Sequence, residues 1–258
     1  IPSKSEPKPT MCSPPSSQKR SMWRTTSSTV AFSAFVRILK KLSKKEIFKR
    51  YTLFVISLFF SAMGVAVTKR GELGVSPISS VANVMSGKFD FLSLGVWLIL
   101  WNCLLILGQV IILRKDFKPI QLLQLPLSFL FGVFTDFGMM CISHIPVSGY
   151  AVRLALVALG IIILGFGVSL SVIANVIMNS GEAFVKALSD KTGIKFGNVK
   201  IGFDVICVVL SVALSLMLFE GSIVGTREGT VLTAVFTGMI VNFFVMRFDK
   251  PLNRIMCK

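Results

Sequence analysis

Hydrophobic residues along this chain gather into six long runs, separated by short polar segments. Each run is close to the roughly 20 helical residues that cross about 30 Å of bilayer hydrocarbon. The pattern therefore predicts an all-α integral membrane protein with about six transmembrane helices, in a polytopic domain over residues 51–248. The expected spans are 51–67, 91–113, 120–142, 151–176, 199–219 and 231–248.

Two further segments, 74–87 and 180–193, are too polar to span a membrane but are patterned like helices. In the first, Ser76 is a candidate cap and Pro77 suits the first helical turn. The second begins with small and acidic residues that suit the positive end of a helix dipole. These residues are Ser180, the candidate cap, followed by Gly181 and Glu182. We predict that each segment forms a half-length or re-entrant helix after the first span of its half.

The two halves, 51–142 and 151–248, carry an internal repeat of small and polar positions. The matches are Ser57 with Gly160, Gly64 with Gly167, Thr68 with Ser171, Trp101-Asn102 with Phe203-Asp204, and Ser128, Gly132 and Asp136 with Ala234, Gly238 and Asn242. Three crossings reverse the chain direction, so the second half is inverted relative to the first. Inverted halves with half-length helices are typical of secondary transporters, whose substrates bind near the midplane.

Asp136 lies inside an apolar run, where an unpaired carboxylate costs at least a few kcal/mol. It is either a ligand or proton site in a cavity, or a carboxylate bonded to Asn242 or Ser128 that holds helices together. Asn102 has the same two interpretations, with interhelical bonding favoured. Asp204 lies near a helix end and is expected to be solvated there. Glu182 is either a gating or proton-accepting group or an exposed first-turn acid.

The composition agrees with a membrane protein, being 53% hydrophobic with a mean hydropathy of +0.76. The net charge of +16 could indicate a nucleic-acid partner, but the positions of the basic residues argue otherwise. With both termini in the cytoplasm, 23 of the 28 Lys and Arg residues lie inside, as the positive-inside rule requires. We expect attraction to anionic lipid headgroups and no nucleic-acid partner.

The regions outside the spans are polar. Residues 1–33 form a predicted disordered or non-native tail, and Met11 or Met22 is an alternative start that would place 1–21 outside the native product. Residues 34–50 are patterned as a basic, cytoplasmic amphipathic helix at the membrane interface. A signal peptide is rejected because the apolar patch is too short. Residues 249–258 form a cytoplasmic tail.

The sequence gives little support for catalysis, a metal or another cofactor. The five cysteines are scattered and the single histidine, His144, lies beside Pro146, so no disulfide framework or metal site is expected. The segment 225–230 lacks the spacing of a phosphate-binding loop and is predicted to be a turn with an Arg-Glu pair. We therefore expect a protein that is not an enzyme.

Several segments resemble the YczE/YitT type of bacterial multi-pass membrane protein. They are GELGVSPISS, LLQLPLSFLFGVFTDF, GEAFVKALSDKTGIKFGNVKIGFDV and VGTREGTVLTAVFTGMIVNFF. The resemblance covers roughly residues 48–248 and implies a polytopic protein of the bacterial inner membrane, either a transporter or an accessory to secretion or secondary metabolism. The family has no settled biochemical activity. Such proteins often have proline near the start of the second re-entrant segment, where this chain has Ser180-Gly181.

Two functional hypotheses follow. The first is a transporter-like protein that moves a small polar or anionic metabolite, because two exposed helix N-termini favour an anion. Its candidate substrate-binding residues are Asp136, Asn242, Asn102, Asp204, Ser76, Pro77, Ser180, Gly181 and Glu182. The second is a non-transporting scaffold that assembles a partner complex. The sequence leaves open the substrate, the coupling ion, the direction of transport and the oligomeric state, a homodimer included.

Overall fold

The computed structural model describes residues 44–114, 117, 119–194, 196–222 and 224–257. Its α-helices are α3 (Lys44–Arg70), α4 (Pro77–Lys88), α5 (Leu94–Leu113), α6 (Gln124–Ile142), α7 (Tyr150–Ala174), α8 (Ser180–Thr192), α9 (Phe196–Leu218) and α10 (Glu228–Cys257). The short 3-10 helix η2 (Pro119–Leu123) leads into α6. The predicted tail 1–33 and residues 34–43 of the predicted amphipathic helix lie outside the described residues.

The prediction of six spans is confirmed within the described part of the chain. Six helices there are long and apolar enough to cross a membrane: α3, α5, α6, α7, α9 and α10. Two of them extend further than hydropathy indicates. α3 begins at Lys44, and α10 continues through Pro251 to Cys257, so the predicted tail from residue 249 is helical up to Cys257. Hydropathy detects only the part of a helix that lies in the bilayer hydrocarbon. The backbone hydrogen bonds of the helix can continue beyond that part into the polar regions on either side.

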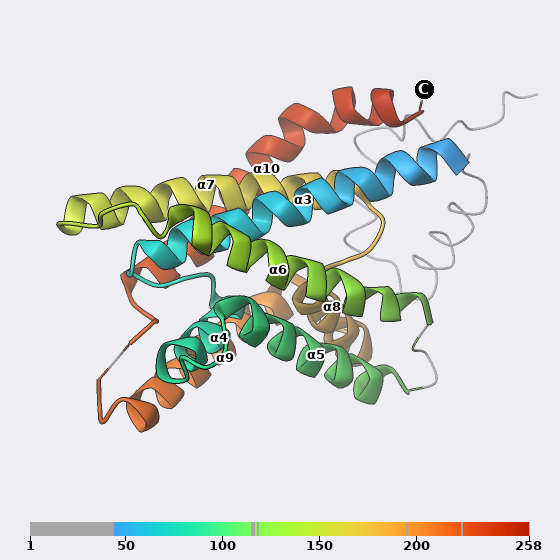
Figure 1. Ribbon diagram of the computed structural model, residues 1–258. Coiled ribbons are helices and arrows are strands. Elements are labelled where there is room, and N and C mark those ends of the chain that lie inside the picture. Colours follow the sequence, from blue (N-terminus) through green and yellow to red (C-terminus); the bar gives the residue numbers. More distant parts are fainter. Residues whose placement is uncertain (1–43, 115–116, 118, 195, 223, 258) are drawn as a thin grey trace, which may run out of the picture.

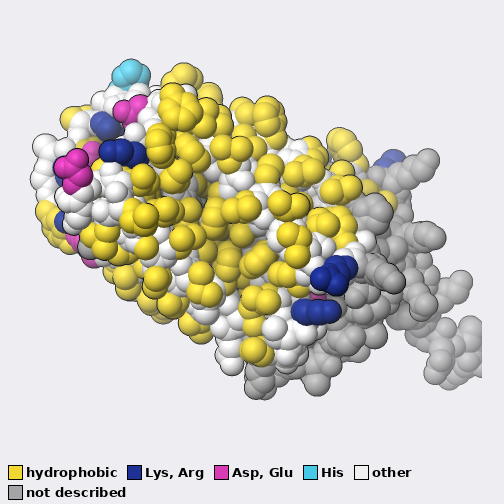
Figure 2. Space-filling view, turned by 90° about the horizontal axis from the view of Figure 1, so that it is seen from below, with side chains coloured by type: hydrophobic (Ala, Val, Ile, Leu, Met, Phe, Trp, Pro, Cys, Tyr) yellow, Lys and Arg dark blue, Asp and Glu magenta, His cyan; other side chains and the backbone are white. Residues whose placement is uncertain are grey.

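The helices form two layers, with α3, α6, α7 and α10 above α4, α5, α8 and α9 in the view of Figure 1. We call the right-hand end in that view, where α3 begins and α10 ends, the terminal end. The left-hand end, where α3 ends and α10 begins, is the loop end. On the face in Figure 2, hydrophobic side chains cover the middle of the molecule and charged side chains gather towards its ends. This distribution suits a bundle that spans a bilayer.

The antiparallel pair α3 and α7 forms the centre of the upper layer. A Cβ added to Gly64 would lie 2.5 Å from the backbone nitrogen of Leu164. A Cβ added to Gly160 would lie 2.8 Å from the backbone nitrogen of Thr68. Small residues therefore let the two backbones touch, which is the usual way that helices gain packing energy inside a membrane.

The remaining helices pack in corresponding pairs. α6 packs on α3 as α10 packs on α7, α5 packs on α4 as α9 packs on α8, and α4 packs on α9 as α5 packs on α8. Three pairs lack a counterpart of similar extent in the described residues. α5 packs on α6, whereas α9 and α10 make at most marginal contact; α10 also contacts α3 and α4, whereas α6 makes at most marginal contact with α7 and α8. In Figure 1, α10 runs upward and away from α9.

The two predicted short helices are confirmed as helices of 12 residues (α4) and 13 residues (α8). At 1.5 Å per residue each is about 20 Å long, too short to span the hydrocarbon. Ser76 occupies the N-cap position of α4, with Pro77 at the first turn. The prediction that Ser180 caps α8 is wrong by one residue, because Asn179 is the N-cap and Ser180 is already helical. Its hydroxyl bonds to another helix instead.

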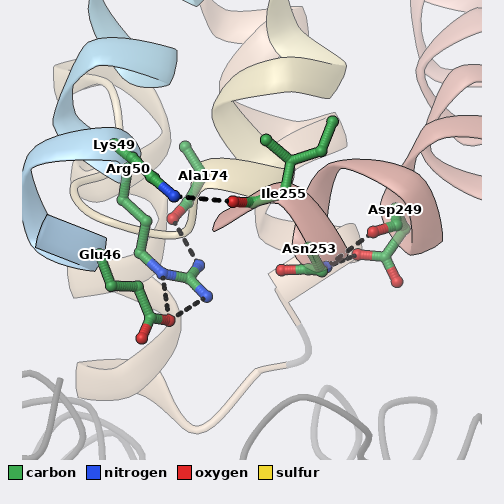
Figure 3. A network of polar contacts seen from close by, with 7 residues as sticks. All are labelled: Glu46, Lys49, Arg50, Ala174, Asp249, Asn253 and Ile255. Atoms are coloured by element: carbon green, nitrogen blue, oxygen red, sulfur yellow. Dashed lines mark hydrogen bonds and ion pairs between the residues drawn. The ribbon is translucent and has the colours of Figure 1, made fainter. Parts of the chain in front are cut away.

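At the terminal end, polar contacts join three upper-layer helices, as Figure 3 shows. The Arg50 guanidinium pairs with Glu46 at 3.1 Å and donates at 3.2 Å to the Ala174 carbonyl at the end of α7. The Lys49 ammonium donates to the Ile255 carbonyl in α10 at 3.1 Å. Residues 44–50, predicted as part of an interfacial helix, are thus the first turns of α3 and tie it to α7 and α10.

Candidate functional site

The Asp136 carboxylate joins α6 to the start of α5. Oδ2 accepts from the Ser93 hydroxyl at 2.5 Å, and Oδ1 accepts from the Gly95 backbone N–H at 2.8 Å. Ser93 is the N-cap of α5 and also accepts from the Val96 N–H at 3.2 Å. Asp136 therefore serves an interhelical contact, with Ser93 and Gly95 as partners in place of the expected Asn242 or Ser128. A carboxylate suits this place because the first N–H groups of a helix lack intrahelical acceptors.

Around Asp136 lies an open cleft at the loop end, with a volume of about 400 Å³. Lys69 from α3, Ser86 from α4 and Asp90 from the α4–α5 turn line it together with Ser93. The Lys69 ammonium donates to the Ser86 hydroxyl at 3.2 Å. This bond joins α3 to α4 beside the Asp136 contact, so polar side chains connect four helices around the cleft.

A second polar centre joins α5 to the start of α8. The Ser180 hydroxyl donates to the Asn102 side-chain oxygen at 2.7 Å. The fully buried Gln109 amide donates to the Ser180 carbonyl at 3.0 Å and to the Gln124 side-chain oxygen at 3.1 Å. Asn102 thus bonds across helices, as expected.

Sequence reasoning missed Gln109 and Gln124. The signal was present, since each is an amide within or at the edge of an apolar run, where a polar side chain needs a partner. The shift of 102 positions relates Gln109 to Ser211, and the shift of 106 positions relates Gln124 to Thr230. Both counterparts are polar and buried, so the repeat could also have singled out the two glutamines.

Three ionisable residues, Glu182, Lys200 and Asp204, lie next to the polar centre at the start of α8. The Lys200 ammonium pairs with both carboxylate oxygens of Asp204, one turn further along α9, at 2.5 and 2.6 Å. Burial raises the pKa of the Glu182 carboxyl at the start of α8; Lys200 opposes that shift and Asp204 adds to it. Asp204 is therefore an ion-pair partner of Lys200, and 21% of its side-chain surface stays accessible.

The first turns of α4 and α8 meet beside these groups. A Cβ added to Gly181 would lie 2.9 Å from Cδ1 of Ile78, the residue after the buried Pro77. Ser76 donates to the Ser79 hydroxyl at 2.9 Å. Trp101, next to Asn102, packs against two hydrophobic clusters, one that includes Leu98 and one that includes Phe203. Its buried indole nitrogen has no hydrogen-bond partner among the described residues.

The structure divides the predicted site residues into three places. Asn102, Ser180, Gly181, Glu182 and Asp204 gather around the α8 start, with Pro77 and Ser76 on the α4 turn that meets it. Asp136 belongs to the loop-end contact. Asn242 lies exposed on α10. Within the described residues there is no cluster of His, Cys, Asp and Glu that could hold a metal ion.

Comparison with known proteins places the chain in a family. A family model described as a family of unknown function, DUF6198, matches residues 48–246. The chain belongs to this family. It is also 28% identical over 211 residues to the uncharacterized membrane protein YczE of Bacillus subtilis (strain 168), an alignment that covers 81% of this chain and 92% of YczE. The resemblance to YczE-type proteins is thereby confirmed. No solved structure matches the chain.

Proposed function

We propose that this DUF6198 protein is a secondary-transporter-like carrier that moves a small polar or anionic metabolite across the bacterial inner membrane, without catalysing a reaction. One observation carries the proposal: the first turns of two non-spanning helices, α4 and α8, meet inside the bundle beside a polar centre. Half-helix N-termini that converge within a membrane are the usual binding elements of such carriers.

The paired packing of the helices supports an inverted-repeat organisation with re-entrant α4 and α8. The repeat relates α3 to α7, α4 to α8, α5 to α9 and α6 to α10. Under this exchange, the packed pair α3–α6 becomes α7–α10, the pair α4–α5 becomes α8–α9, and the pair α4–α9 becomes α8–α5. A chain of two three-span halves has its second half inverted, so the exchange corresponds to a two-fold axis in the membrane plane.

The distribution of basic residues supports an orientation with both chain ends in the cytoplasm. The terminal end carries Lys49, Arg50 and Arg254, and the 23 to 5 division of Lys and Arg favours this end inside. In this orientation the Asp136 contact closes the periplasmic side.

The groups around the α8 start favour a polar solute with an acceptor or anionic group. The helix N-termini offer N–H groups and positive dipole ends, and the Trp101 indole N–H lacks a partner among the described residues. Lys200 is neutralised by Asp204. Burial raises the pKa of Glu182, which weakens its repulsion of a nearby anion at a given pH.

The test is the thermal stability of purified protein in detergent, screened against small organic anions, amino acids and vitamins at several pH values. We expect a ligand that raises the unfolding temperature of the wild type but not of Asn102→Ala, while Ser169→Ala, which changes a buried α7 serine away from the centre, keeps the response. If no solute raises the temperature and Asn102→Ala only lowers it, the polar centre is structural, and a scaffold that assembles partners becomes the better account.

A further inference from the structure

One helix pair is closed in the first half of the chain and open in the second. α5 packs on α6, whereas the corresponding helices α9 and α10 make at most marginal contact in the part of the chain that the structure describes. α10 instead contacts α3 and α4, whereas α6 makes at most marginal contact with α7 and α8 among the described residues. The difference between the halves therefore lies in where α10 packs.

At the closest approach of the closed interface lie Gly95 and Ile99 of α5, and Gly132 and Asp136 of α6. A Cβ added to Gly132 would lie 2.5 Å from Cγ1 of Ile99 and 2.6 Å from the Gly95 carbonyl oxygen. Asp136 accepts from the Gly95 N–H one turn away. Two glycines thus bring the helices together, and one acceptor side chain completes the contact.

The second half carries the counterparts of these four residues. The shift of 102 positions that relates Asn102 to Asp204 also relates Gly95 to Gly197 and Ile99 to Ile201. The shift of 106 positions relates Gly132 to Gly238 and Asp136 to Asn242. Three of the four residues are identical, and the asparagine side chain keeps an acceptor oxygen.

None of these counterparts is packed. Gly197, Gly238 and Asn242 are exposed, and 66% of the Ile201 surface is accessible. A Cβ added to Gly197 or to Gly238 would have no atom within 4 Å. The second half therefore has the residues of a closed interface in an open state.

We propose that α9 closes on α10 through these four residues in a second conformation, and that α5 separates from α6 as it does so. The Asn242 side-chain oxygen then accepts from the Gly197 N–H, as Asp136 accepts from Gly95. The exchange closes the terminal side of the polar centre while the loop side opens, which is alternating access. The inference rests on the proposed carrier function and adds its two gates.

The test is disulfide crosslinking in native membranes, in a chain whose five native cysteines are replaced by serine. The pair Ile201→Cys with Gly238→Cys reports closure of α9 on α10, and Ile99→Cys with Gly132→Cys reports the closed α5–α6 interface. A mismatched pair, Ile201→Cys with Met239→Cys, moves one cysteine about 100° around α10. Copper phenanthroline serves as the oxidant.

We expect both matched pairs to crosslink within one chain, each faster than the mismatched pair. Crosslinking of the 99/132 pair alone would overturn the proposal, because the open interface would then be permanent. A crosslinked dimer through the 201/238 pair would also overturn it and would make this face a contact between copies. None of these crosslinking outcomes depends on knowing a substrate. A negative crosslinking result therefore rejects the two gates without deciding the carrier function, which the ligand screen tests separately.

A second variant tests whether closing the α9–α10 interface requires the α5–α6 interface to open. Gly238→Leu adds a side chain into open space in the present structure but blocks closure of α9 on α10. In the 99/132 cysteine chain it should raise the initial rate of crosslinking, whereas Gly202→Leu, also in open space, should not. An unchanged rate with Gly238→Leu would show that the two interfaces are not linked.

Discussion

At the scale of single residues, the Asp136 carboxylate connects two helices by accepting from the Ser93 hydroxyl and the Gly95 N–H. It occupies the place of a helix-capping acceptor but comes from a neighbouring helix. Hydrogen bonds between membrane helices contribute modestly, on average about 0.6 kcal/mol and up to about 2 kcal/mol.

The Ser93–Asp136 bond can be measured by a double-mutant cycle. We expect Ser93→Ala and Asp136→Ala to lower the free energy of unfolding by less together than the sum of their separate effects, with a coupling of about 0.5–2 kcal/mol. The measurement is unfolding of the purified protein in mixed detergent. Ser143→Ala, which changes an exposed serine at the end of α6, should show no coupling to Asp136→Ala. Additive effects of the first pair would contradict the contact.

Glu182 provides a prediction for pH dependence. A carboxyl whose pKa is higher in the folded protein than in the unfolded chain stabilises the fold only while it is protonated. Stability from this group is therefore complete below the ordinary pKa of glutamate and is lost as the pH rises through the raised value. We expect Glu182→Gln to flatten the fall in unfolding temperature with rising pH. The exposed Glu220→Gln is the control, and an unchanged slope in Glu182→Gln would contradict the assignment.

At the scale of helices, glycine positions decide which pairs can touch. Gly64 lets α3 and α7 make backbone contact, whereas Gly202 of α9 faces open space. We expect Gly64→Leu to lower the free energy of unfolding by about 1–3 kcal/mol or to prevent folding, because an overpacked interface must separate. Gly202→Leu should have little effect. Thermal unfolding of both variants in the same detergent measures the difference, and equal stabilities would contradict the α3–α7 packing.

Element by element, hydropathy and cap signals were enough to predict the six spans and both short helices, because each depends on local sequence. The partners of the polar residues could not be predicted in the same way. Ser93 and Asp136 are separated by 43 residues, and Asn102 and Ser180 by 78. The internal repeat relates Asp136 to Asn242, but two positions that an internal repeat relates need not lie close together in space. Whether α9 packs on α10 depends on conformation rather than on residue type.

At the scale of the whole molecule, the distribution of basic residues predicts the orientation in the membrane. In the proposed orientation, with both chain ends in the cytoplasm, the α6–α7 turn faces the periplasm and the α8–α9 turn faces the cytoplasm. In a chain without native cysteines, His144→Cys should react with a membrane-impermeant maleimide in intact cells, and Gly193→Cys only after permeabilisation. Both positions are exposed, so the reverse pattern would invert the topology and the assignment of the two ends.

The central claim is that the polar centre at the start of α8 becomes accessible to water-soluble molecules. It is tested most directly by alkylation of Ser180→Cys with a small hydrophilic thiol reagent in membrane vesicles, beside Ser169→Cys as a control. Both serines are buried, at 5% and 0% exposure, but only Ser180 lies at the proposed site. The account predicts that Ser180→Cys reacts and Ser169→Cys does not. If both cysteines are equally unreactive, the centre is a sealed structural core and the protein is not a carrier.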